Sequence, residues 1–137
     1  MTTINAYINF AGTCREAMTF YKECLGGNLT FQPVAGTPME TQSPASMKDK
    51  ILHSSLQKDS LVIMGSDMTY PGFIQGNNVS LSINCSSEDE INTFFEKLSE
   101  GAQVLHPLAD SFWGARFGVL ADKFGTRWML NYEKSKS

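Results

Sequence analysis

Polar and apolar side chains alternate along two segments of the chain. The first segment is Ile4–Phe10 and the second is Asn78–Cys85. Alternation with a period of two places the two kinds of side chain on opposite faces of a β-strand. We therefore expect two strands that each have one apolar and one polar face. The polar residues are Asn5, Tyr7 and Asn9 in the first strand and Asn78, Ser80, Ser82 and Asn84 in the second.

A helix is predicted directly after each of these strands. In Thr13–Glu16 a threonine stands three residues before a glutamate, and in Ser86–Glu90 two serines precede three acidic residues. Both patterns are typical of helix N-termini. Gly26 and Gly27 end the first helix and Gly101 ends the second, because glycine adopts the backbone conformation that closes a helix. Apolar residues recur at helical spacing between these limits, namely Ala17, Phe20, Tyr21, Cys24 and Leu25, then Ile91, Phe94, Phe95 and Leu98.

Three further strand segments follow each predicted helix. The same element order thus occurs twice, which together with the likeness of Ile8–Phe10 to Ile83–Cys85 indicates a duplicated βαβββ unit. We predict an α+β fold in one domain, 1–137, with modules at about 3–70 and 77–133 that form a curved, partly open eight-stranded barrel with helices on the outside. The strand segments are Leu29–Val34, Ile51–Gln57 and Leu61–Ser66, then Gln103–His106, Ala115–Ala121 and Arg127–Tyr132.

The polar faces of the two alternating strands carry seven hydrogen-bonding side chains. A fully buried sheet face would not normally carry so many polar groups. These faces are therefore either open to solvent or line a wet, concave binding site, and the curvature of sheets favours the second interpretation. Two aperiodic segments, Gln32–Asp49 and Met68–Asn77, are candidate lids because long loops of this kind often cover binding sites.

Charge and cysteine content narrow the function classes. A net charge of −3 without clustered basic residues argues against nucleic-acid binding. No apolar run approaches the roughly 20 residues that span a bilayer, and the first four residues lack the features of a signal peptide. Cys14, Cys24 and Cys85 are odd in number and form no C-x-x-C pair, which favours buried free thiols in a reducing cytoplasm.

Several motifs resemble one known superfamily. They are Phe20-Tyr21 before Leu25-Gly26, the Phe112–Gly114 segment (Phe-Trp-Gly) and the Asp122–Gly125 turn (Asp-Lys-Phe-Gly). Together with the two-fold βαβββ plan, they resemble the vicinal oxygen chelate superfamily, which includes glyoxalase I, bleomycin-resistance proteins and extradiol dioxygenases. Within it the chain most resembles the PhnB-like branch, over roughly residues 3–133. The resemblance implies a homodimer.

Metal-dependent members of this superfamily carry His, Gln or Glu on the first, fourth, fifth and eighth strands. The resemblance assigns those positions to Asn5, Met64, Ser80 (or, with a slip of two, Asn78) and Met129. A thioether is a soft ligand, and amides and hydroxyls bind cations weakly without carboxylates beside them. The four strand segments concerned contain no His, Asp or Glu. We therefore expect no metal at the usual site and no cofactor.

Six residues are predicted to line the pocket. Aromatic side chains offer flat apolar contact, methionines pack adaptably, an arginine can hold an anionic group, and a histidine can bind a ligand or move a proton. No acidic partner can be assigned to the histidine, so no catalytic residue is predicted. The alternative is that the tryptophan and the methionines simply fill the core. The six residues are Tyr7, His53, Met64, Trp113, Arg116 and Met129.

The function that these observations favour is metal-independent binding of a small, partly apolar molecule. One alternative is a lyase, isomerase or oxygenase of the same superfamily that holds a metal in an atypical way. Another is a partner-binding module whose cavity is vestigial. Some PhnB-like proteins are called methyltransferases. A nucleotide-like methyl donor is bound by a strand, a glycine-rich loop and a helix in that order, and this chain shows no such unit. Its Gly26-Gly27 pair follows a predicted helix instead of a strand.

Overall fold

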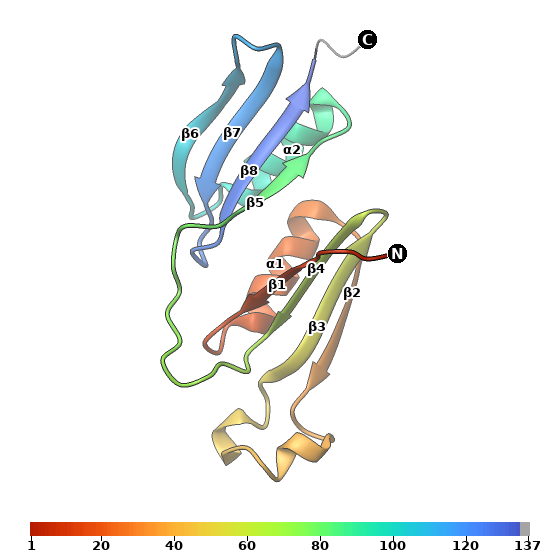
Figure 1. Cartoon of the computed structure of the whole chain (residues 1–137), viewed down its shortest axis with the longest axis vertical. Helices are drawn as coiled ribbons and strands as arrows, with labels where there is room; N and C mark the ends of the chain where they lie inside the picture. The colour runs from red at the N-terminus through yellow and green to blue at the C-terminus, as the bar shows by residue number, and fades with distance from the viewer. Residues whose placement is uncertain (135–137) are drawn as a thin grey trace. The chain divides into compact units, whose positions relative to one another are not determined.

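The computed structural model describes residues 1–134, and the chain divides into two compact units, Met1–Phe73 and Ile74–Ser137. Each unit contains one helix and one four-stranded sheet, with the helix against one face of the sheet (Figure 1). The elements of the first unit are β1 (Ala6–Asn9), α1 (Cys14–Leu25), β2 (Asn28–Pro33), β3 (Ile51–Lys58) and β4 (Leu61–Ser66). Those of the second unit are β5 (Ser80–Asn84), α2 (Glu88–Leu98), β6 (Gln103–Asp110), β7 (Ala115–Ala121) and β8 (Arg127–Glu133).

The two sheets have the same strand order. It is β1-β4-β3-β2 in the first unit and β5-β8-β7-β6 in the second, so the first strand of each unit pairs with the last. That pairing is parallel, because the helix carries the chain back to the starting end, and the other pairings are antiparallel. The predicted α+β fold with a duplicated βαβββ unit is confirmed.

Each helix covers the apolar face of its own sheet. In α1, the side chains of Ala17, Met18 and Tyr21 are completely buried, and in α2 those of Ile91 and Leu98 are. These residues repeat every three to four positions, which places them on one side of each helix. The polar residues of the alternating strands therefore lie on the opposite sheet face, away from the helices. Within each unit, a binding site can therefore form on the sheet face that the helix leaves uncovered.

Strand β6 differs from its prediction. The sequence predicts its end at His106, before Pro107, but the strand continues to Asp110. Two register shifts interrupt its pairing with β7, between Val104 and His106 and between His106 and Ala109. β6 lies at the edge of its sheet, where a proline and irregular pairing are tolerated. The predicted end was therefore wrong.

The long segment between β2 and β3 is ordered by its own hydrogen bonds. It contains two short 3₁₀ helices, Pro38–Glu40 and Ala45–Met47. The buried Val34 donates its backbone N–H to the Lys50 carbonyl oxygen at 2.9 Å, which continues the β2–β3 pairing into the segment. Within residues 1–134, none of the helices is long and apolar enough to cross a membrane.

Candidate functional site

The polar face of the first sheet brings together residues from all four of its strands. Tyr7 on β1 pairs with Met64 on β4, Met64 pairs with Ser55 on β3, and Ser55 pairs with Thr30 on β2. Partners in register point to the same side of a sheet, so these four side chains form one line across it. We call Tyr7, Met64, Ser55 and Thr30 the first-unit row.

His53 lies on the same face, two residues before Ser55. The phenol oxygen of Tyr7 is 3.4 Å from Nδ1 of His53, and the two ring centroids are 5.8 Å apart with the planes tilted by 35°. Both side chains are exposed, with Tyr7 at 47%. Two ring faces at this spacing offer a flat, partly apolar surface with hydrogen-bonding groups at its margin.

Ser55 is the residue whose role in the fold is unexplained. Its neighbour Ser54 points toward α1, where its hydroxyl donates to the Gly65 carbonyl at 2.9 Å and lies 3.4 Å from Sγ of Cys14. Ser55 therefore points to the opposite face. Its Oγ is shielded from solvent and has no hydrogen-bond partner among the described residues. A buried hydroxyl without a partner costs roughly 1–3 kcal/mol, so a ligand that reached this atom, after the side chains shielding it had moved, would gain a hydrogen bond.

Asp67 holds the ends of three segments of the first unit together. It directly follows β4, is 3% exposed, and accepts backbone N–H groups from Gly12, Cys14 and Ile51 at 2.9–3.0 Å. The predicted N-cap residue Thr13 makes no side-chain hydrogen bond to α1, and Asp67 caps the N-terminus of the helix instead. Sequence patterns missed this residue because the two partners of a cap are normally three residues apart.

The second sheet has a corresponding line of residues. Ser82 on β5 pairs with Met129 on β8, Met129 pairs with Val119 on β7, and Val119 pairs with His106 on β6. We call these four residues the second-unit row. Met129 thus occupies the position in its sheet that Met64 occupies in the first.

Trp113 lies in the connection between β6 and β7 and belongs to a group of aromatic rings. Its ring centroid is 5.1 Å from that of Phe112 and 5.8 Å from that of Phe117, and Phe117 is 5.4 Å from His106. Phe117 and Val119 alternate with residues that face α2, so this group lies on the Met129 side of the sheet. Trp113 is 55% exposed and does not fill the core of its unit.

Arg116 lies on the other side of the second sheet. Its Nε donates to Oδ1 of Asn92 on α2 at 2.8 Å, and its Nη1 is 3.3 Å from the Asp110 carboxylate. Gly118, two residues later, would bring a Cβ within 2.5 Å of the Phe95 ring on α2. Arg116 therefore faces the helix, whereas Met129 faces away from it, and the two predicted site residues do not share a face.

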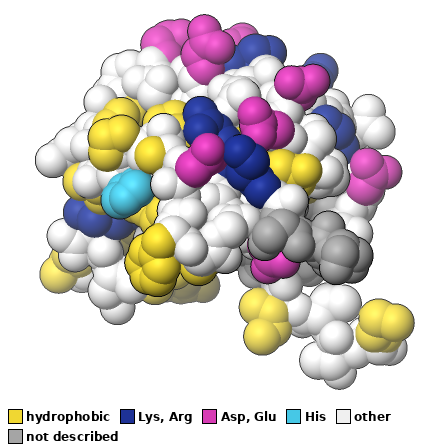
Figure 2. All heavy atoms as spheres, turned by 90° about the horizontal axis from the view of Figure 1, so that it is seen from above, with side chains coloured by type: hydrophobic (Ala, Val, Ile, Leu, Met, Phe, Trp, Pro, Cys, Tyr) yellow, Lys and Arg dark blue, Asp and Glu magenta, His cyan; other side chains and the backbone are white. Residues whose placement is uncertain are grey.

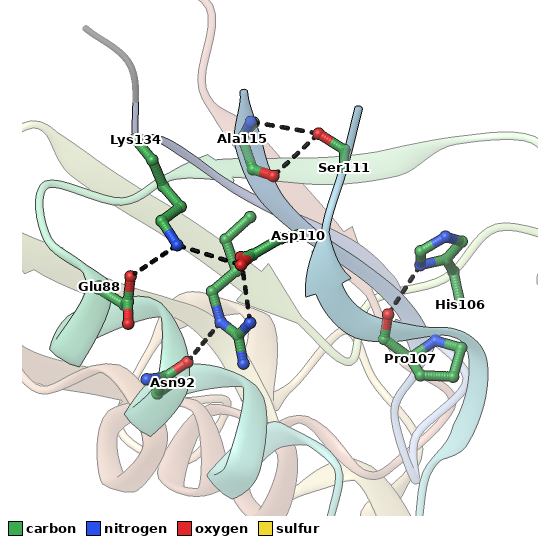
Figure 3. A network of polar contacts seen from close by, with 9 residues as sticks. Glu88, Asn92, His106, Pro107, Asp110, Ser111, Ala115 and Lys134 are labelled. Atoms are coloured by element: carbon green, nitrogen blue, oxygen red, sulfur yellow. Dashed lines mark hydrogen bonds and ion pairs between the residues drawn. The ribbon is translucent and has the colours of Figure 1, made fainter. Parts of the chain in front are cut away.

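Lys134 extends the ion pair of Arg116 into a network (Figure 3). Its Nζ lies 3.1 Å from the Asp110 carboxylate and 3.3 Å from that of Glu88. The hydrogen bond from Lys134 lowers the pKa of Asp110, and the same bond raises the pKa of Lys134. Figure 2 shows Lys and Arg side chains directly beside Asp and Glu, so the charges on this face neutralise one another.

An open hollow of about 300 Å³ adjoins this network. Its floor is the turn in which Ala115 donates its backbone N–H to the Ser111 hydroxyl at 3.2 Å, and the hydroxyl donates back to the Ala115 carbonyl at 2.8 Å (Figure 3). Its polar groups already have partners within the chain, so little is left to bind a ligand. It is lined by Asp110, Ser111, Gly114, Ala115 and Lys134.

The groups able to bind a metal are dispersed. Among residues 1–134, no three His, Cys, Asp or Glu side chains come close enough together to hold an ion. The cysteines are buried, and burial raises the pKa of the Cys14 thiol to about 11 and that of Cys85 to about 12. These two thiols therefore remain protonated at neutral pH, and a protonated thiol is neither a good nucleophile nor a good ligand.

Comparison with known proteins points to one family. The family described as 3-demethylubiquinone-9 3-methyltransferase matches residues 2–131. The protein PA1353 from Pseudomonas aeruginosa superposes with a TM-score of 0.84 at 40% identity, covering 97% of this chain and 98% of that one. The PhnB protein from Bacillus cereus gives 0.74 at 25% identity, over 96% and 99% of the two chains.

The fold is shared more widely. A glyoxalase/bleomycin resistance protein/dioxygenase from Nocardioides superposes with a TM-score of 0.61 at 19% identity, covering all of this chain and 87% of that one. At this identity the likeness concerns the fold alone. It agrees with the superfamily that the sequence motifs resemble.

Proposed function

The chain belongs to the family described as 3-demethylubiquinone-9 3-methyltransferase, the PhnB-like branch of the vicinal oxygen chelate superfamily, and from this premise we propose that it binds a small molecule without a metal. The binding surface is the polar face of the first sheet, with Tyr7, His53 and Met64 in contact with the ligand. The aromatic group around Trp113 and the Met129 side of the second sheet are a second candidate contact surface.

One observation carries this proposal, namely the unpartnered hydroxyl of Ser55. It lies in register between Met64 and Thr30, on the face that also carries Tyr7 and His53. Buried polar groups in folded proteins almost always have partners, and an exception calls for an explanation such as a ligand. A ligand that supplies the missing hydrogen bond would remove the cost of this arrangement.

The donor set supports the proposed metal independence. The positions to which the superfamily assigns metal ligands carry Asn5, Met64, Ser80 and Met129, which provide two thioethers, an amide and a hydroxyl. Divalent cations of the hard or borderline kind prefer imidazole, carboxylate or thiolate ligands. These residues do not fit such an ion, and no step through a metal is derived for them.

The family description names a methyltransferase, and the residues do not fit a methyl donor of the nucleotide-like kind. Such a donor needs a glycine-rich loop whose backbone N–H groups stand free after a strand. Here Gly26 and Gly27 follow α1, and a Cβ on Gly27 would lie 2.7 Å from the Gln57 carbonyl oxygen. This glycine is needed for close packing against β3, so methyl transfer is not proposed.

The proposal also covers location and assembly. Three buried free cysteines suit a reducing compartment, and we place the protein in the cytoplasm. The family likeness supports a homodimer, and sedimentation of the purified protein would measure its mass in solution. The segments Gln32–Asp49 and Met68–Asn77 remain candidate lids, and slower proteolysis of either segment in the presence of a bound ligand would support that role.

The test is a ligand screen on protein freed of metal. Protein is treated with chelator, its metal content is checked by elemental analysis, and a small-molecule library is screened by thermal shift and by amide chemical shifts. We expect at least one compound to stabilise the protein and to shift the amides of Tyr7, His53 and Ser55. Tyr7→Ala should weaken binding, whereas Thr19→Ala, an exposed change on α1, should not.

Two results would overturn the proposal. One is a screen in which no compound shifts the amides of the first-unit row. The other is binding that requires an added divalent metal, since that would move the metal-dependent lyase, isomerase or oxygenase to first place.

A further inference from the structure

We propose that the ligand of the first sheet is an uncharged, planar aromatic molecule with one hydroxyl or amino group, and that this group hydrogen-bonds to Ser55. The inference rests on the proposed function and specifies the ligand class for the same face. It has three parts, which concern shape, charge and the polar group.

The shape follows from the two rings. Tyr7 and His53 lie 5.8 Å apart with their planes tilted by 35°, and both are exposed on the face. Aromatic rings favour offset stacking or edge contact with another flat ring. Met64, directly beside Tyr7 in the sheet, adds a thioether that packs well against aromatic surfaces. A flat molecule can use all three side chains at once.

The proposal that the ligand is uncharged rests on the side chains that the strands of this face carry. Their outward positions, opposite α1, hold no Lys, Arg, Asp or Glu, and a charged ligand would lose hydration without gaining an ion pair. Lys58 points the other way and donates to the Leu25 carbonyl at 3.0 Å. Arg116, predicted to hold an anion, bonds to Asn92 and Asp110 in the second unit. The outward residues are Tyr7, Asn9, Asn28, Thr30, Gln32, His53, Ser55, Gln57, Val62, Met64 and Ser66.

The proposal that the ligand carries one hydroxyl or amino group rests on the position of Ser55. Its hydroxyl can both donate and accept one hydrogen bond, and no described residue takes either role. A ligand ring lying against Tyr7 and Met64 would present its edge toward β3, the strand that carries Ser55. A hydroxyl or amino substituent on that edge supplies the missing partner once the side chains that shield Oγ from solvent move aside.

Four probes of similar size separate these three parts. They are 2-naphthol, naphthalene without the hydroxyl, anionic 2-naphthoate, and the non-planar decahydro-2-naphthol. Dissociation constants are measured by amide chemical shifts on the whole chain. We expect 2-naphthol to bind most tightly and naphthalene to bind about tenfold more weakly, since one hydrogen bond is lost. The naphthoate and the decahydro compound should bind at least tenfold more weakly than 2-naphthol.

Ser55→Ala tests the hydrogen bond. It should reduce the difference between 2-naphthol and naphthalene to less than about twofold, because neither probe then has a partner for its edge. The matched control is Ser60→Ala, which removes an exposed serine hydroxyl from the turn between β3 and β4 and should leave the tenfold difference intact. Removing an unpartnered hydroxyl leaves the fold intact, and unchanged circular dichroism of both variants checks this.

The outcomes distinguish the ligand class from the proposed function. If 2-naphthoate or the decahydro compound binds as tightly as 2-naphthol, the ligand class is wrong. It is also wrong if Ser55→Ala leaves the difference between 2-naphthol and naphthalene unchanged. If the probes fail but other library compounds shift the amides of Tyr7 and His53, the ligand class is wrong and the binding function stands. If no compound at all shifts these amides, both fail.

Discussion

Each unit has a methionine in the middle of its row, Met64 in the first and Met129 in the second, and the side chains beside it differ between the units. In the first unit, Tyr7 stands on one side of it and Ser55 on the other. In the second unit, the same two positions carry Ser82 and Val119. The first combination offers a ring and an unpartnered hydroxyl, and the second offers a small polar group and a methyl-rich side chain.

This difference shows which properties the duplication has kept. Strand order and register are common to both units, because they set the packing of the sheet on its helix, and both sheets also carry a methionine at the same outward position. The outward side chains are free to diverge, since they contribute little to that packing. The outward face of the first sheet therefore carries the Tyr7 and His53 rings beside Ser55, whereas that of the second carries exposed aromatic rings at its β6–β7 end.

The units also differ in how the helix begins. Helix α1 is capped by Asp67, from beyond the last strand of its unit, whereas α2 is capped by Ser87, which accepts the Glu90 N–H at 3.0 Å. Glu90 in turn accepts the backbone N–H of Ser86 at 2.9 Å. The second cap is local and exposed, and the first is buried and joins distant segments.

The largest expected effect on stability tests the difference in capping between α1 and α2. Asp67→Ala should lower the free energy of unfolding by about 3 kcal/mol or more, because three backbone N–H groups lose a buried acceptor. Ser87→Ala should cost about 1 kcal/mol, since only one exposed cap bond is lost. Urea denaturation measures both. Equal losses for the two variants would contradict the view that Asp67 joins three segments.

A second, smaller effect compares the glycines that face the two helices. A Cβ on Gly118 would lie 2.5 Å from the Phe95 ring, whereas one on Gly65 would lie 3.0 Å from the Phe10 ring. Gly118→Ala should therefore destabilise the protein by about 2 kcal/mol. Gly65→Ala should cost less, because Met18 and Phe10 can shift by a few tenths of an ångström. Thermal unfolding would reveal the order, and a larger loss for Gly65→Ala would contradict it.

Exchanging the residue types at positions 55 and 119, which lie beside Met64 and Met129, tests the difference between the first-unit row and the second-unit row. Ser55→Val should leave stability unchanged or raise it by about 1 kcal/mol, since it removes a hydroxyl without a partner. Val119→Ser should lower stability by about 1 kcal/mol, because it loses apolar burial. Denaturation of the ligand-free variants is the measurement. A clear loss of stability in Ser55→Val would mean that the Ser55 hydroxyl has a partner in the folded protein.

The smallest effect concerns the exposed ion pairs of the second unit. Lys134→Ala should leave the unfolding midpoint nearly unchanged, because solvent screens charges at this exposure. The pKa of Asp110 should nevertheless rise toward its ordinary value, since the hydrogen bond from Lys134 is the main cause of its lowering. A carboxyl titration by NMR measures the shift. Asp110 then becomes protonated at a higher pH than in the original protein, and an unchanged titration would contradict the network.

The fold could be predicted from the sequence because its signals are local. Alternation in β1 and β5 and the helical spacing in α1 and α2 are set by residues a few positions apart. The end of β6 was missed because the tolerance of Pro107 depends on its strand lying at an edge, which only the assembled sheet decides. The other strand ends agree with their predictions to within two residues, and those of β4 and β7 are identical to them.

The candidate site was predictable in part. Tyr7 and Met64 lie in segments with clear alternation or strand character, and the register places them side by side. Residues 115–121 alternate weakly, so their pattern does not indicate that Arg116 faces α2. Ser55 and Asp67 could not be singled out, because whether a polar group has a partner depends on residues far away in the chain.

The bonds of Asp67 also bear on the order in which the units form. Its bonds to Gly12 and Cys14 join residues 55 and 53 positions apart, so they cannot form until β4 has reached α1, whereas the Ser87 cap spans three positions. Contacts between distant residues carry a larger loop-closure entropy and slow folding. The N-terminus of α2 can thus be ordered early and alone. That of α1 becomes ordered in the same step as the sheet it covers, and the surface carrying Ser55 is complete only then.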